Sequence, residues 1–204
     1  MRTLGHLDRI LGDAELRPSA PSPQIMAMPA ALRPFTVEEI EAFPDDGNRY
    51  ELLYGVLLVT PAPGLPHQTV ASRLLGLLAA FLKEEPGLEV WSPGVVQIRP
   101  SIHLEPDILI GKLPPIPRWD AVQDHWLAVE VSGTASRVYD RDYKRDGYLG
   151  IGIKQVWLVD LDTRQFLVSQ PGGEKDVSHD GTFTWQSPAG RELRIDIPAL
   201  FRGL

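Results

Sequence analysis

A strand, a helix and a second strand follow one another between residues 125 and 160, and this order constrains the fold more than any other feature. HWLAVEVS and QVWLVD are apolar runs of strand length, and residues 138–150 between them suit a helix. A strand followed by a helix and another strand implies a right-handed crossover between parallel strands. The chain is therefore predicted to form an α/β domain around a sheet that contains a parallel pair.

The first long helix is predicted to begin near Pro66, which suits a first helical turn. Pro86 and Gly87 end it. Its apolar residues form a stripe too wide for a surface helix: Val70, Ala71, Leu74, Leu75, Leu77, Leu78, Phe81 and Leu82. We expect this helix to be buried against the sheet.

Further strands are predicted on both sides of these elements. RYELLYGVLLVT has apolar runs on either side of Tyr54 and Gly55, which is typical of a hairpin. Residues 88–99 and 104–110 are two more strand candidates. Near the C-terminus, RQFLVSQ, TFTWQ and ELRIDI are separated by Gly-rich turns. We expect these three segments to add antiparallel strands to the same sheet.

Residues 1–33 differ in composition from the rest of the chain. A weak helical pattern leads into RPSAPSPQIMAMPAALRP, where repeated Pro, Ala and Ser cannot assemble a packed core. Thr36 and Glu39 then have the spacing of a capping box for a short helix. We therefore expect a flexible N-terminal extension over residues 1–33 and one domain over residues 34–204.

The composition narrows the classes of site and partner. The 20 Lys plus Arg and 27 Asp plus Glu give a formal net charge of -7, which argues against a large basic nucleic-acid surface. Cysteine is absent, so a metal would need carboxylate or imidazole ligands. No apolar run approaches the roughly 20 residues of a membrane span, and residues 1–25 lack the apolar core of a secretory signal. We expect a cytosolic protein.

Glu130 is an acidic residue inside the apolar strand predicted over residues 125–132. Alternate residues of a strand share a face, so Glu130 projects with Ala128 and Ser132. Burying an unpaired carboxylate is costly, so such a group must be protonated, paired with a cation or bound to a metal. The alternative is a glutamate at the strand end that reaches solvent or pairs with an arginine.

Asp107 heads a second apolar run, EPDILI, in which Pro106 marks the start or edge of a strand. Aspartate is disfavoured in strands, so its presence is informative. The alternative is a turn residue that caps the strand. If the two strands pair antiparallel, Asp107 and Glu130 point into one cleft. Carboxylates held so close repel unless a divalent cation lies between them, and oxygen ligands favour Mg²⁺ or Mn²⁺.

Asp140, Lys144 and Tyr148 recur every four residues in the next predicted helix and so line one face. A helix that returns over the sheet directly after Glu130 brings Lys144 beside that carboxylate. An ammonium there could orient or deprotonate an attacking water and stabilise negative charge on a phosphoryl oxygen. The alternative is a surface ion pair between Lys144 and Asp140.

Basic residues lie in or beside the same predicted helix, near the candidate site: Arg137, Arg141, Arg145 and Lys154. They offer modest positive charge for a phosphate backbone. The alternative is a solvated helix face, because aspartates are interspersed among them.

These segments, in this order and spacing, resemble the PD-(D/E)XK restriction-endonuclease-like superfamily and, within it, the bacterial Uma-two family of endonucleases. The resemblance covers residues 34–204 through RYELLYGVLLVTPAPGLPHQTV, EPDILIG, AVEVSG and the D-x3-K-x3-Y-x3-G series before QVWLVD. It implies a restriction-endonuclease-like α/β core, with a central mixed sheet flanked by helices and additional antiparallel strands at the N- and C-terminal ends. Asp107 and Glu130 match the acidic metal ligands of the family, and Lys144 matches its lysine.

Position 132 departs from the superfamily pattern, in which the lysine lies two residues after the second acid. Ser132 stands there, and Lys144 completes the set from the helix, as looks normal for the Uma-two family. Glu51 and His67 also match recurrent residues of the family. Glu51 is either a third carboxylate on the metal side or a solvent-facing strand residue. His67 either binds a phosphate or water near the metal or satisfies free backbone N–H groups at the helix start.

The resemblance therefore predicts a Mg²⁺- or Mn²⁺-dependent endonuclease with DNA as its substrate, in which Asp107, Glu130 and Lys144 act with Glu51 and His67. One alternative is a non-catalytic module that keeps the fold and binds nucleic acid or a protein. Another is a metal-dependent hydrolase of a different phosphate ester. No membrane partner is expected, and analogy with restriction-type enzymes favours a homodimer.

Overall fold

The computed structural model describes residues 33–133, 136 and 138–204, and within them the central element is a six-stranded sheet. β7 and β8 run parallel, whereas its other neighbouring strands run antiparallel. In spatial order the strands are β10 (Val177–His179), β9 (Gln165–Ser169), β8 (Gln155–Asp160), β7 (His125–Ser132), β6 (Ile108–Gly111) and β3 (Glu89–Trp91). The predicted parallel pair and mixed α/β class are confirmed. The predicted extension falls almost entirely on residues 1–32, outside the described residues.

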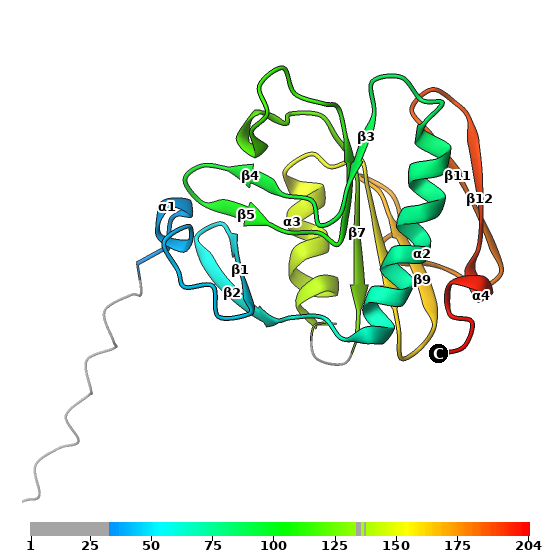
Figure 1. The fold of residues 1–204 in the computed structure, drawn as a ribbon, viewed down its shortest axis with the longest axis horizontal. Coiled ribbons are helices and arrows are strands. Elements are labelled where there is room, and N and C mark those ends of the chain that lie inside the picture. The colour runs from blue at the N-terminus through cyan, green and yellow to red at the C-terminus, as the bar shows by residue number, and fades with distance from the viewer. Residues whose placement is uncertain (1–32, 134–135, 137) are drawn as a thin grey trace, which may run out of the picture. The chain divides into compact units, whose positions relative to one another are not determined.

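Helices cover both faces of this sheet (Figure 1). α2 (Leu65–Leu82) lies on one side of β7, and the π-helix η2 (Tyr139–Lys144) with α3 (Arg145–Gly150) lies on the other. Leu127 and Val129 pack in the cluster of α2, whereas Ala128 packs in the cluster of α3. The alternation predicted along β7 therefore separates two apolar layers, and Glu130 belongs to the layer of α3.

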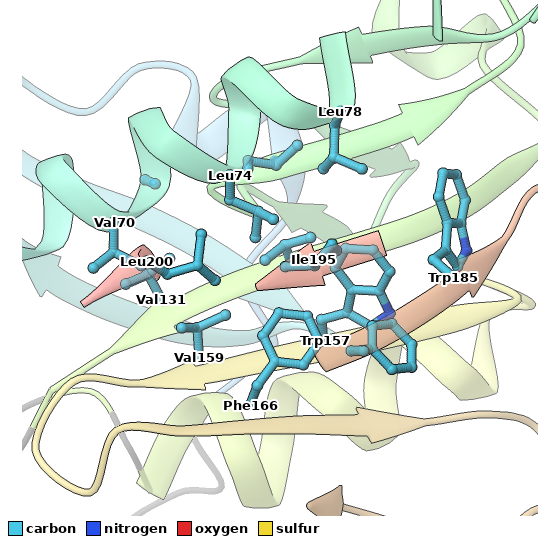
Figure 2. Packing of buried hydrophobic residues seen from close by; sticks show 14 of the residues in the cluster. Val70, Leu74, Leu78, Val131, Trp157, Val159, Phe166, Trp185, Ile195 and Leu200 are labelled. Atoms are coloured by element: carbon cyan, nitrogen blue, oxygen red, sulfur yellow. The ribbon is translucent and has the colours of Figure 1, made fainter. Parts of the chain in front are cut away.

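α2 is buried against the sheet as predicted. Val70, Leu74 and Leu78 point from α2 toward Val131 and Trp157 of the sheet (Figure 2). The predicted stripe was too wide by one residue, because Leu77 is exposed. Buried positions recur mainly every four residues, and Leu77 falls at the edge of that face.

The C-terminal hairpin is a correction to the predicted sheet. RQFLVSQ supplies β9 of the central sheet, but β11 (Thr182–Gln186) and β12 (Glu192–Asp196) form a separate two-stranded sheet, followed by α4 (Ile197–Leu200). The rings of Phe183 and Trp185 pack nearly perpendicular to Trp157, with centroids 5.5 and 5.7 Å apart. Burying these rings on the sheet face explains why the hairpin stacks there.

The N-terminal hairpin belongs to a further, four-stranded sheet. Its strands are, in spatial order, β2 (Val56–Pro61), β1 (Asn48–Leu53), β5 (Ile102–Leu104) and β4 (Val96–Ile98). Tyr54 and Gly55 both have positive φ, 52° and 81°, as a two-residue type I′ turn requires. The hairpin predicted around these two residues is confirmed.

The two central strand candidates are each divided between sheets. Residues 88–99 contain β3 and β4, and residues 104–110 contain the end of β5 and most of β6. Pro93 and Pro106 lie at the divisions, where the missing N–H removes a ladder hydrogen bond. Apolar periodicity therefore identified strand residues but not the points at which the chain changes sheet.

Two short helices complete the described residues. The capping box of α1 (Val37–Ile40) is confirmed, because Thr36 N donates to Glu39 Oε2 at 2.9 Å and Glu39 N donates to Thr36 Oγ1 at 3.4 Å. A 3₁₀ helix, η1 (Trp119–Ala121), precedes β7. Among the described residues, no helix combines the length and apolarity needed to cross a membrane.

Candidate active site

A pocket of about 320 Å³ opens beside the C-terminal end of β7, between the start of α2 and η2. Of the predicted site residues, His67, Asp107, Glu130 and Lys144 line it. Glu51 is fully buried behind them and contacts Lys144. The structure therefore brings all five predicted residues together.

Asp107 and Glu130 face each other across neighbouring strands. Ile108 pairs with Val129 in the antiparallel ladder of β6 and β7, so the positions just beyond this pair are those of the two acids. Facing positions project to the same side of a sheet, and both carboxylates line the pocket. This is the arrangement that the two-carboxylate hypothesis required.

Asp107 is buried and held by three donors. Its Oδ1 accepts a hydrogen bond of 3.0 Å from Arg49, and its Oδ2 accepts one of 2.8 Å from the backbone N–H of Val131. His67 Nε2 lies 2.9 Å from the same Oδ2. Burial opposes ionisation, but His67, the Val131 amide and Arg49 together hold the pKa of Asp107 below its ordinary value. Asp107 is therefore an ionised carboxylate that its partners hold in one orientation.

Arg49 is a pocket residue that sequence reasoning missed. It precedes Glu51 by two positions in β1, so both side chains share one face of the strand. Glu51 came from the family resemblance, and strand alternation from Glu51 could have pointed to Arg49. Its side chain is 23% exposed, lines the pocket and contacts Asp107 through the guanidinium.

Glu130 is buried and accepts two hydrogen bonds at one oxygen. Oε1 accepts from Tyr148 Oη at 2.7 Å and from Lys144 Nζ at 3.3 Å. Burial raises the pKa of Glu130 well above its ordinary value despite Lys144, and the nearby Asp140, Asp107 and Glu51 add to that increase. Burial and the Glu130 charge also raise the pKa of Tyr148, which keeps its hydroxyl a donor.

Lys144 lies among three carboxylates. Its Nζ is 2.6 Å from Glu51 Oε2, 3.3 Å from Glu130 Oε1 and 3.5 Å from Asp140 Oδ1. The contact to Glu51 is an ion pair. Burial opposes the charge of Lys144, but Glu130, Glu51 and Asp140 outweigh it and raise its pKa. Lys144 is therefore a buried ammonium.

The backbone of η2 positions the side chains of Asp140 and Lys144. The N–H of Arg145 donates to the carbonyl of Asp140, the i→i+5 spacing of a π-helix. The predicted α-helix is thus wider in its first turn, and a regular helix, α3, begins at Arg145. Across η2 and α3, the side chains of Asp140, Lys144 and Tyr148 still point inward together, and all three are buried. Wide turns of this kind recur at functional sites.

Two of the four basic residues predicted to attract a phosphate backbone are in ion pairs within the protein. Arg141 Nε lies 2.8 Å and Arg145 Nη1 2.5 Å from Asp176 Oδ2. Lys154 is exposed, and Arg137 lies outside the described residues. The alternative of a solvated helix face therefore holds only in part, because Arg145 is buried and its ion pair with Asp176 reaches outside the helix.

The pocket offers donors of the chemical type that a divalent cation takes, although both oxygens of Asp107 also accept hydrogen bonds. Asp107 and Glu130 supply hard carboxylate oxygens at its wall, the ligands that Mg²⁺ and Mn²⁺ prefer. Among residues 33–133, 136 and 138–204, no three acids or imidazoles already form a cluster spaced for a metal. In this arrangement Lys144 and Arg49 balance the carboxylate charges.

A comparison with known protein families identifies a family to which the chain is similar. Residues 37–197 match the model of the Uma2 family, which is described as "Putative restriction endonuclease". The match spans most of the chain. This chain belongs to the Uma2 family. The Uma2 assignment confirms the resemblance to the Uma-two endonucleases stated from the sequence.

The fold of this Uma2 protein is similar to that of a solved structure. The crystal structure of a "putative nuclease" from Anabaena variabilis matches with a TM-score of 0.68 at 19% identity, over 82% of this chain and 98% of that chain. Such a likeness establishes a shared fold. No curated protein matches this Uma2 chain in sequence.

Proposed function

We propose that this chain is a metal-dependent endonuclease that hydrolyses DNA phosphodiester bonds at the pocket. The observation that carries the proposal is the ammonium of Lys144, which lies between Glu51 and Glu130 beside the wall formed by Asp107. Buried charges are costly unless they are paired, and a binding module gains nothing from collecting carboxylates in its interior. A hydrolytic centre uses such a set directly.

Asp107 and Glu130 would hold the divalent cation. When bound, a Mg²⁺ or Mn²⁺ ion lowers the pKa of a bound water and polarises a phosphoryl oxygen. Arg49 and His67 keep the carboxylate of Asp107 ionised and oriented toward the pocket. Tyr148 orients Glu130 through its hydroxyl.

Lys144 acts as a cation in this scheme. Its raised pKa means that it holds its proton at neutral pH, so it orients the attacking water and stabilises negative charge on the phosphoryl oxygen. A role as general base is disfavoured for the same reason. Glu51 fixes the ammonium through the 2.6 Å ion pair, which makes it a positioning residue.

The experiment is incubation of the purified full chain with supercoiled, linear and single-stranded DNA, in Mg²⁺, in Mn²⁺ and in chelator. We expect cleavage of at least one substrate with metal, no cleavage in chelator, and strong loss in Glu130→Gln and Lys144→Ala. Cleavage that survives both substitutions, or intact DNA under every condition, would refute the nuclease. Intact DNA that the protein nevertheless binds would favour the non-catalytic module.

A further inference from the structure

Tyr139 is an exposed aromatic residue at the mouth of the pocket. It is the first residue of η2, the residue is 44% exposed, and it lines the same pocket as Lys144. The neighbouring Tyr143 lies one turn further, with its ring centroid 6.4 Å away, and does not line the pocket. The proposed reaction assigns no role to Tyr139.

The pocket is lined by both polar and apolar side chains. The polar lining includes the nitrogen-bearing side chains of Arg49, His67 and Lys144 beside the carboxylates. The lining also includes ring and aliphatic side chains: Val59, Pro61, Pro63, Pro66 and Leu161, together with Tyr139. A nucleotide combines the same two chemistries, with a charged phosphate at one end and a flat base with two apolar faces at the other.

The size of the pocket favours an unpaired nucleotide base over a base in a duplex. A cavity of about 320 Å³ is at the lower end of the range that encloses a small molecule, so it has room for one nucleotide unit. In a duplex, bases are covered by pairing and stacking and must be pulled out before a pocket can enclose them. An unpaired strand presents its bases without that cost.

The pairing of the protein's cations also favours a single strand over a duplex. A duplex is held mainly by cations that release counterions from its phosphates. In the part of the chain that the structure describes, many cations are already in ion pairs with carboxylates: Arg99, Lys112, Arg118, Arg141, Arg145, Lys175 and Arg191. Proteins that bind single strands rely more on stacking with aromatic side chains.

We propose that the substrate is single-stranded or locally unpaired DNA, whose base stacks on Tyr139 while its phosphate enters toward Arg49 and Lys144. This inference rests on the proposed endonuclease function. Tyr139 is then a substrate-binding residue, and its ring, not its hydroxyl, supplies the interaction.

The test compares one fluorescein-labelled oligonucleotide as a single strand and as a duplex of the same sequence, in Mn²⁺. We expect kcat/KM for the single strand to exceed that for the duplex by at least about tenfold, because the duplex must open first. Tyr139→Ala should lower kcat/KM on the single strand by about 5- to 150-fold, as loss of one stacked base does. Tyr139→Phe, which keeps the ring, and Tyr143→Ala, which alters the neighbour outside the pocket, should cleave like the wild type.

Binding of the same strands, measured by fluorescence anisotropy in chelator, separates the two proposals. Duplex cleaved as fast as single strand, or Tyr139→Ala indistinguishable from Tyr143→Ala, would overturn the inference and leave the nuclease standing. Single-strand binding that depends on Tyr139, without cleavage in any metal, would support the inference and refute the nuclease. Neither binding nor cleavage of any strand would overturn both.

Discussion

Lys144 Nζ and Glu51 Oε2 lie 2.6 Å apart, and both side chains are buried. The pair joins η2, which follows the central strand β7, to β1 of the four-stranded sheet. Asp140 and Glu130 complete the surroundings of the ammonium. Lys144 is therefore the cation that Glu51, Glu130 and Asp140 share, whereas Arg49 pairs with Asp107.

Lys144→Met should destabilise the fold by about 3–5 kcal/mol at neutral pH, because it leaves Glu51, Glu130 and Asp140 without their cation. The raised pKa of Lys144 means that its stabilisation is fully present below its ordinary value of 10.5 and is lost as pH rises through the folded value. Urea unfolding at pH 7 measures the loss. Lys175→Met, which removes an exposed pair with Asp146, is the control and should change stability little.

Asp176→Asn should weaken the attachment of η2 and α3, since Asp176 accepts from Arg141 and Arg145. Burial opposes ionisation, but the two arginines hold the pKa of Asp176 below its ordinary 3.8. Its contribution is therefore present above pH 3.8 and is lost as pH falls through the lowered pKa. We expect a loss of about 1–2 kcal/mol at pH 7 that shrinks below pH 4, measured by urea unfolding across this range. A difference from wild type that is constant with pH would contradict this role.

Leu74 and Leu77 lie one turn apart on α2 but differ in burial. Leu74→Ala should cost about 2–5 kcal/mol, because it opens a cavity against the sheet. Leu77→Ala should change the free energy of unfolding by about 0.5 kcal/mol or less. If both substitutions lowered the free energy of unfolding equally in thermal or urea unfolding, Leu77 would be buried, as the predicted apolar stripe implied.

Gly147 and Gly76 are two helical glycines with opposite surroundings. A Cβ on Gly147 would lie 2.7 Å from Leu53 Cδ1, whereas one on Gly76 meets nothing within 4 Å. Gly76→Ala should stabilise the protein by about 0.5–1 kcal/mol through helix propensity. Gly147→Ala should instead lower stability by up to about 2 kcal/mol, because overpacking outweighs that gain. Stabilisation by both substitutions would contradict close packing of α3 on β1.

Much of the fold and the candidate site could be predicted because strand periodicity fixes which side chains share a face. This holds for Glu130 in β7 and for the crossover into β8. Periodicity does not say which sheet a strand joins, so the division of residues 88–99 and the stacked hairpin of β11 and β12 were not predictable from it. Those outcomes depend on long-range packing, as with Phe183 on Trp157.

The local details of the site had a similar limit. Spacing by four placed Lys144 and Tyr148 on one helix face, and both do reach Glu130. The π-turn that carries Lys144 leaves no mark on that spacing. Arg49 was within reach of the periodicity argument, but a lone arginine in a strand has many roles until its partner, Asp107, is known.

The most direct test of a shared reaction centre is Mn²⁺ binding by calorimetry, measured beside DNA cleavage, in wild type, Asp107→Asn and Glu130→Gln. If the two carboxylates hold the ion at which DNA is cleaved, each variant loses Mn²⁺ binding and each slows cleavage by at least about 100-fold. A variant that binds Mn²⁺ and cleaves DNA as the wild type does would contradict the proposed centre.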